Sequence, residues 1–139
     1  KEFKIGVIPH YRDFKKVEAF YKNEKGITLI DLMTNDVEKT TDAFLKCEKI
    51  VSSSLHGVIV AHAYGIPAVW QKFSDDVFGD DIKYQDYFES VLLTPYTPEI
   101  KNSKMSLVEL QSLFNNKETL PKTEVIEGLC NNLMAVCPF

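Results

Sequence analysis

A segment of three serines followed by a long apolar run, Ser52–Pro67, constrains the fold more than any other part of the chain. Lys49–Ser52 has the β-branched, apolar character of a short buried strand, and Leu55–Tyr64 has the length and composition of a helix. This helix is apolar on nearly every side, which predicts that it lies inside the domain. Ser53 or Ser54 is expected to cap its first turn with a hydroxyl oxygen.

Other apolar runs alternate with helical patterns in the first half of the chain. Strands that are apolar throughout and that alternate with helices predict a parallel sheet covered on both faces. We therefore expect a Rossmann-like three-layer α/β/α domain with a mainly parallel sheet, built from residues 1–139 as one domain. The expected strands are Phe3–Pro9, Ile27–Met33, Lys49–Ser52 and Pro67–Trp70. The expected helices before the serines are Phe14–Lys22, capped by Asp13, and Val37–Cys47, capped within the loop Thr34–Asp36.

The pattern is weaker after Trp70. We expect the C-terminal helices to pack on the domain and close it, with Ser106 and Glu109 forming a capping box at the start of one of them. The remaining expectations are a loop at Gln71–Ile82, a short helix at Tyr84–Ser90, a strand or extended segment at Val91–Leu93, an irregular stretch at Thr94–Asn102 and a last helix that begins near Pro121.

Composition excludes several classes of protein. The 139 residues are 45% hydrophobic with a net charge of −4, which argues for a folded core and against a nucleic-acid-binding surface. The three cysteines form no CxxC pattern, so we expect neither a metal site nor a disulfide framework. No apolar run is long enough to span a membrane, and we expect a cytoplasmic location. Because the chain begins at Lys1 without methionine, we expect it to be part of a longer polypeptide.

The start of the central helix is a candidate anion-binding site. Free N–H groups and the positive end of the helix dipole meet there, next to small hydroxyl side chains. His56 lies in the first turn, where an imidazole can exchange a proton near neutral pH. Arg12, the only arginine in the chain, can hold a carboxylate or phosphate with two parallel hydrogen bonds, although a solvated loop residue paired with Asp13 is the simpler interpretation. We expect His62, deeper in the helix, to be structural.

No motif supports other common ligands or reactions. The chain has no GxGxxG or P-loop pattern for a nucleotide and no GxSxG pattern around the serines for a nucleophile.

Three segments of the chain share features with one known family. They are Val7–Tyr11 with Asp13, Ile50–Gly57 continuing to Ala61–Pro67, and Lys83–Ser90. Together they resemble the polysaccharide pyruvyl transferase family, and the serine-leucine-histidine-glycine sequence at Ser54–Gly57 is the most specific part of this resemblance. Members of the family resemble GT-B glycosyltransferases, with two Rossmann-like domains and a cleft between them, and the resemblance implies that this sequence is the C-terminal domain.

The resemblance implies transfer of a pyruvyl group from phosphoenolpyruvate to a sugar of a cell-surface polysaccharide, as in exopolysaccharide biosynthesis. It implies no cofactor beyond this donor substrate. His56 matches the motif histidine of the family and is expected to protonate the leaving phosphate or the enol carbon. Many members carry arginine immediately before the leucine, where this chain has Ser54, which predicts a weaker grip on the donor. The expected substrate-binding residues are Ser52, Ser53, Ser54, Leu55, Gly57, His10, Arg12 and Lys72.

Two alternatives remain open from the sequence. One is a GT-B glycosyltransferase domain that uses a nucleotide sugar, with its base and ribose near Asn35 and Trp70. The other is a non-catalytic remnant of the fold that binds a glycan or a partner. The sugar acceptor is expected to contact mainly the N-terminal domain of such a protein, so we predict that this chain alone is inactive.

Overall fold

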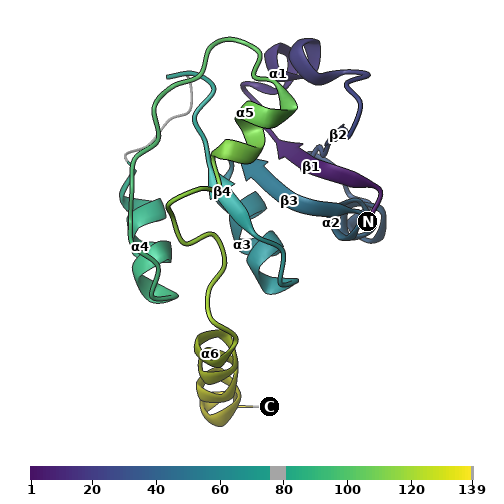
Figure 1. Cartoon of the computed structure of the whole chain (residues 1–139). Coiled ribbons are helices and arrows are strands. Elements are labelled where there is room, and N and C mark those ends of the chain that lie inside the picture. Colours follow the sequence, from purple (N-terminus) through teal and green to yellow (C-terminus); the bar gives the residue numbers. More distant parts are fainter. Residues whose placement is uncertain (76–80, 139) are drawn as a thin grey trace.

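The computed structural model of the chain describes residues 1–75 and 81–138. Across these residues a four-stranded, all-parallel sheet is covered by helices on both faces, which confirms the predicted Rossmann-like α/β/α class (Figure 1). The predicted loop at Gln71–Ile82 lies partly outside the described residues. The elements are β1 (Phe3–Ile8), α1 (Phe14–Tyr21), β2 (Ile27–Leu29), α2 (Val37–Leu45), β3 (Cys47–Ser52), α3 (Leu55–Ala63), β4 (Ala68–Trp70), α4 (Ile82–Ser90), α5 (Leu107–Ser112) and α6 (Thr123–Val136).

The strands lie in the order β2-β1-β3-β4. The register places Val7 of β1 opposite Leu29 on one side and Val51 on the other, and Ser52 opposite Trp70. Because all four strands are parallel, their carboxyl ends meet at one edge of the sheet. The loops that follow Ile8, Leu29, Ser52 and Trp70 therefore gather at that edge, where ligands bind in open parallel sheets.

Consecutive strand residues enter two separate cores, as the period of two in a strand requires. Ile50 packs on the face covered by α2, α3 and α4, and the next residue, Val51, packs on the face covered by α1 and α5. Both side chains are fully buried. This double burial is why most strand residues are apolar, whereas the charged residues Lys4 and Glu48 lie at exposed positions near the starts of β1 and β3.

Several predicted boundaries are wrong by a few residues. β2 ends at Leu29, since the Asp31 carboxylate accepts a hydrogen bond from the N–H of Met33 (2.9 Å) and turns the chain. α2 ends at Leu45, and Cys47 already belongs to β3. Val91–Leu93 forms a turn at the end of α4 and not a strand, with Leu92 at a φ of 58°.

The predicted helix caps have mixed outcomes. The capping box of Ser106 and Glu109 at α5 is confirmed, and Asp36 caps α2 by accepting from the N–H of Lys39 (3.0 Å). Asp13 occupies the N-cap position of α1, but its side chain makes no capping hydrogen bond. Its buried carboxylate accepts a hydrogen bond from the Ser74 hydroxyl instead, which ties the start of α1 to the loop after β4.

The prediction that both C-terminal helices close the domain is wrong for α6. No residue of α6 is buried, and Figure 1 shows this helix extending away from the sheet. Leu133 and Met134 are largely exposed, and Val125 and Ile126, in its first turn, are the positions that reach the core. The apolar residues of α6 that suggested packing thus lie mostly in solvent.

The three cysteines occupy two different environments. Cys47 is fully buried, its thiol donates to the carbonyl of Ala43 (3.3 Å), and burial raises its pKa to about 11. Cys130 and Cys137 are exposed, on and just after α6. No helix in the described part of the chain combines the length and the apolar character needed to cross a membrane.

Candidate active site

The loops after β1, β2 and β3 enclose a cavity at the carboxyl edge of the sheet. Its volume is about 510 Å³, within the range of small-molecule sites. His56 lines this cavity from the first turn of α3, and we call it the His56 cavity. Its lining residues are Pro9, His10, Tyr11, Asp31, Leu32, Met33, Ser54, Leu55, His56, Val60 and Lys83.

Helix α3 is more exposed than predicted. Gly57, Val58, Ala61 and His62 are buried against the sheet, whereas the opposite side of the helix, with Ile59 at 37% exposure, faces outward. A helix that is apolar on every side has no polar face to mark the side exposed to solvent, so the sequence could not indicate which side of α3 would remain uncovered. His56 lies on the exposed side, at the rim of the cavity.

The hydroxyl that organises the start of α3 belongs to Ser52. Its Oγ accepts from the N–H of Ser54 (3.0 Å) and lies within donating distance of the carbonyls of Ser54 (2.8 Å) and Ile8 (3.1 Å). Ser54 occupies the N-cap position, but its side chain makes no capping hydrogen bond, so the predicted hydroxyl cap is wrong. Gly57 packs directly on Ser52, because any Cβ at this position would overlap the Ser52 hydroxyl.

Ser53 joins β1 to the same turn. Its buried Oγ accepts from the N–H of His10 (2.7 Å), and its carbonyl accepts from the hydroxyl of Tyr84 (2.9 Å). The hydroxyl of Tyr84 also lies near the N–H of Leu55, and burial raises the pKa of this phenol. The hydroxyls of Ser52 and Ser53 thus form hydrogen bonds with backbone groups of the protein, whereas Ser54 lines the cavity.

Two backbone donors remain at the start of α3. Within residues 1–75 and 81–138, the N–H groups of His56 and Gly57 donate to no protein acceptor. The first hydrogen bond of the helix is donated by Val58 to the carbonyl of Ser54 (3.3 Å). These donors, with the positive end of the helix dipole, can stabilise a bound anion.

His10, in the loop after β1, lines the same cavity as His56. Its Nδ1 accepts from the N–H of Arg12 (3.4 Å), so the neutral ring carries its proton on Nε2. Burial lowers the pKa of His10, and the positive charges of Lys83 and Arg12 lower it further. The negative charge of Asp13 acts in the opposite direction and raises this pKa. His10 is therefore a neutral hydrogen-bonding group at physiological pH.

The two cations expected to hold the second anionic group do not line the cavity. Arg12 is exposed, with its Nε donating to the Tyr11 hydroxyl (3.3 Å). Lys72 forms an ion pair with Asp81 (2.9 Å) and lies above the ring of Trp70, 5.5 Å from its centroid. Of the residues predicted to bind substrate, the structure brings His10, Ser54 and Leu55 to the His56 cavity.

Sequence reasoning did not assign a role to Lys83. This residue lies in the first turn of α4, lines the His56 cavity, and has its ammonium 5.4 Å from the ring centroid of Tyr84. Among the described lining residues it is the one lysine or arginine. The available signal was its position at the start of Lys83–Ser90, the third segment of the family resemblance.

His62, five residues beyond Gly57, is buried as expected of a structural residue. Its Nδ1 lies 2.8 Å from the Tyr87 hydroxyl and its Nε2 lies 2.9 Å from the carbonyl of Thr119. Burial lowers the pKa of this imidazole, so its neutral form is favoured. Among the described residues, no group of three His, Cys, Asp or Glu side chains is placed to hold a metal ion.

Comparison with known proteins relates the first half of the chain to a known family. Residues 4–70 match the family model of the polysaccharide pyruvyl transferases. The predicted resemblance is confirmed over this part, which contains β1–β4 and the Ser54–Gly57 motif, whereas Lys83–Ser90 lies outside the match. The match therefore includes the lining residues of the His56 cavity that come from the loops after β1, β2 and β3 and from α3, but not Lys83 of α4.

One curated relative comes from Acanthamoeba polyphaga mimivirus, where it is named uncharacterized protein L143. It is 40% identical over 88 residues, which are 61% of this chain and 31% of the relative. The chain thus spans about a third of the length of this relative. No solved structure matches the chain.

Proposed function

We propose that this chain forms the donor-binding domain of a pyruvyl transferase that uses phosphoenolpyruvate and modifies a polysaccharide. The observation that carries the proposal is that an exposed His56 and Lys83 line one cavity, and that the N–H groups of His56 and Gly57, at the start of α3 beside this cavity, are unengaged. The family match over residues 4–70 supports the reaction class.

Phosphoenolpyruvate carries a phosphate and a carboxylate, and the cavity offers separate donors for two anionic groups. The N–H groups of His56 and Gly57 suit one group, and Lys83 suits the other as a point charge. Ser54 stands where many family members carry arginine, and in this proposal Lys83 supplies the positive charge that the serine lacks.

Formation of a ketal requires two bond changes at C2 of the donor. One sugar hydroxyl oxygen bonds to C2 while C3 gains a proton, and a second hydroxyl oxygen then displaces phosphate from C2. The two hydroxyl protons balance the proton added to C3 and the proton taken up by the leaving phosphate. The imidazole of His56 transfers one of these protons, as a general acid toward C3 or toward the phosphate.

The structure disfavours the nucleotide-sugar alternative at its expected base-binding position. Trp70 is 3% exposed and its ring is stacked on Tyr84, with centroids 3.8 Å apart and planes at 4°. The indole is therefore enclosed by the protein's own side chains and offers no free face to a base.

Ligand-induced stabilisation tests the proposal. We expect phosphoenolpyruvate to raise the Tm of the chain by the mass-action stabilisation of a bound ligand, and UDP-glucose and GDP-mannose to leave it unchanged. Stabilisation by a nucleotide sugar and not by phosphoenolpyruvate would contradict the proposal and support the glycosyltransferase alternative.

Catalysis by the chain alone is a separate prediction. Since the acceptor is expected to bind mainly to another domain, we expect the 139-residue chain to bind the donor without transferring the pyruvyl group. The measurement is phosphate release from phosphoenolpyruvate in the presence of an acceptor oligosaccharide, and clear turnover would show that the prediction is wrong. In a longer protein that is active, loss of transfer on His56→Gln would separate a catalytic role from the non-catalytic alternative.

A further inference from the structure

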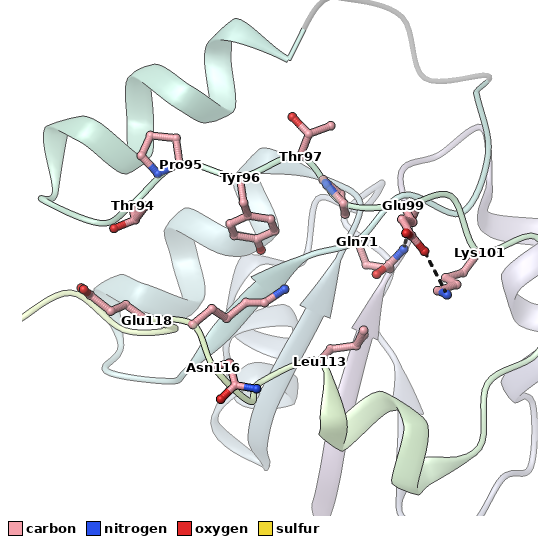
Figure 2. Close-up of a pocket in the computed structure, with 12 residues that line it drawn as sticks. Gln71, Thr94, Pro95, Tyr96, Thr97, Glu99, Lys101, Leu113, Asn116 and Glu118 are labelled. Carbon is pink, nitrogen blue, oxygen red and sulfur yellow. Dashed lines mark hydrogen bonds and ion pairs between the residues drawn. The ribbon is translucent and has the colours of Figure 1, made fainter.

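A second and larger cavity lies beside the outer strand of the sheet, β4. Its volume is about 720 Å³, and it shares no lining residue with the His56 cavity. We call it the Gln71 cavity. Figure 2 shows it between the segment that carries Thr94, Tyr96 and Glu99 and the turn that carries Leu113, Asn116 and Glu118. Its lining residues are Gln71, Thr94, Pro95, Tyr96, Thr97, Pro98, Glu99, Lys101, Leu113, Asn116, Lys117 and Glu118.

The outer edge of β4 is already hydrogen-bonded, which fixes this wall of the cavity. The hydroxyl of Tyr96 accepts from the N–H of Trp70 (2.6 Å) and lies 3.2 Å from its carbonyl. The N–H of Ala68 donates to the carbonyl of Thr119 (2.8 Å). A peptide therefore finds no free ladder groups here for strand addition, and this mode of peptide recognition is excluded.

Gln71 supplies a hydrogen-bond acceptor at the inner wall. The residue is 3% exposed, and its amide nitrogen donates to the carbonyls of Lys72 (2.9 Å) and Glu99. These two bonds fix the orientation of the amide, and Figure 2 shows its oxygen turned toward the cavity. An amide oxygen that is held in place in this way at a cavity wall selects a ligand that donates a hydrogen bond.

Charges in the Gln71 cavity balance. Lys101 is paired with Glu99 (3.6 Å), and Lys117 lies over the ring of Tyr96, 4.3 Å from its centroid. Desolvation lowers the pKa of Lys117, although much of its side chain is exposed. With Glu118 the lining contains two ammonium groups and two carboxylates, which is unlike a site for a phosphate or another strongly anionic ligand.

The other lining groups are uncharged hydrogen-bonding groups set among apolar surfaces. Thr94, Thr97 and Asn116 add hydroxyl and amide groups to the Gln71 oxygen, and Tyr96 with two prolines and Leu113 supplies apolar surface. A ring with many hydroxyls and apolar C–H faces matches this combination of groups. We propose that the Gln71 cavity is a binding site for a neutral saccharide, separate from the donor site.

The identification of this saccharide as a remote part of the acceptor polysaccharide rests on the proposed function, whereas saccharide binding itself does not. A polymeric acceptor can contact the enzyme at sugars other than the one that reacts, and such a contact adds affinity through effective concentration. The Gln71 cavity would then hold the polysaccharide while another sugar reaches the His56 cavity.

Binding is tested by two-dimensional amide NMR of the whole chain with four neutral homotetrasaccharides, built from glucose, galactose, mannose or N-acetylglucosamine. We expect at least one of them to shift the resonances of residues 94–101 and 113–118, with an affinity that changes little with salt. The double variant Thr97→Val, Asn116→Gly removes two hydrogen-bonding side chains and is expected to weaken this binding about tenfold. Glycine suits position 116 because Asn116 has a φ of 60°.

Asn23→Gly is the matched control, since Asn23 also has a positive φ (68°) and lies outside both cavities. It should leave the affinity unchanged. The proposal fails if no tetrasaccharide shifts these resonances, if the double variant binds as tightly as the control, or if phosphoenolpyruvate or inorganic phosphate binds here instead. His56→Gln should bind the tetrasaccharide normally, so a failure of the donor-site proposal is distinguishable from a failure of this one.

Discussion

The two histidines of α3 show how strongly position decides the role of a residue. His56 and His62 lie on one short apolar helix, but His56 faces the cavity at its start and His62 is enclosed between Tyr87 and Thr119. The second ring has both nitrogens engaged, so it can only support the structure. The first has solvent and a cavity beside it, as a proton-transfer group requires.

Substitution of Lys83 tests which cation holds the donor. We expect Lys83→Gln to weaken phosphoenolpyruvate binding by about 10-fold to 100-fold, the effect of losing one charge-assisted hydrogen bond. Lys83→Arg should retain most of the affinity because it retains the charge. The measurement is isothermal titration calorimetry with phosphoenolpyruvate.

Lys72→Gln is the control for this series, since Lys72 is paired with Asp81 and does not line the His56 cavity. Equal losses of affinity in Lys72→Gln and Lys83→Gln would indicate a general effect of net charge and would contradict the proposal that Lys83 binds the donor.

At the scale of elements, the junction between β3 and α3 is the most constrained part of the fold. One hydroxyl, that of Ser52, engages the backbone of Ser54 and the end of β1, and Gly57 packs against it. The positions of the free N–H groups at the helix start depend on this close packing.

Gly57→Ala is expected to disturb this junction. Its Cβ would overlap the Ser52 hydroxyl and approach Ile8 Cγ2 to 3.1 Å, so we expect a loss of about 1–3 kcal/mol in the free energy of unfolding. Gly128→Ala in α6 is the control, because its Cβ would meet nothing within 4 Å. Urea denaturation of both variants measures the difference, and equal stabilities would contradict the proposed packing.

The sheet could be predicted from the sequence because its strands are buried on both faces over most of their length and are therefore mainly apolar, apart from exposed residues such as Lys4 and Glu48. Ile50 and Val51, in separate cores, illustrate the reason. The exposure of α3 and α6 could not be predicted, since an apolar residue signals burial whether or not a neighbour covers it. The place of Lys83 depends on α4 returning to the carboxyl edge, where the Tyr84 hydroxyl bonds to Ser53, and no local pattern encodes that contact.

At the scale of the whole molecule, the buried His62 connects three separate parts of the chain. It contacts Tyr87 of α4 and Thr119 of the segment before α6, and it belongs to α3 itself. Protonation of this imidazole therefore affects the packing of the domain and not only one helix.

Stability is expected to fall in mild acid. Burial lowers the pKa of His62 below its ordinary value of 6.5 in the folded state, so below that pH the unfolded chain binds more protons than the folded chain. The stabilisation is complete at pH values above the ordinary pKa of histidine, and it is lost as the pH falls through the lowered pKa of His62 in the folded state. His10, whose pKa burial also lowers, acts in the same direction.

Urea denaturation between about pH 8 and about pH 5 measures this dependence. His62→Gln should reduce the slope of the unfolding free energy against pH, whereas His56→Gln, at an exposed position, should retain it. An unchanged slope in His62→Gln would show that other groups control the acid response.

The different exposure of the three thiols allows selective chemical labelling of the C-terminal part of the chain. At neutral pH the enclosed Cys47 remains protonated and inaccessible, because its pKa is raised to about 11, whereas Cys130 and Cys137 meet solvent. A maleimide fluorophore will therefore react at the C-terminal end and leave the sheet untouched. Energy transfer from Trp70 to such a dye would report the distance between the sheet and α6 in solution.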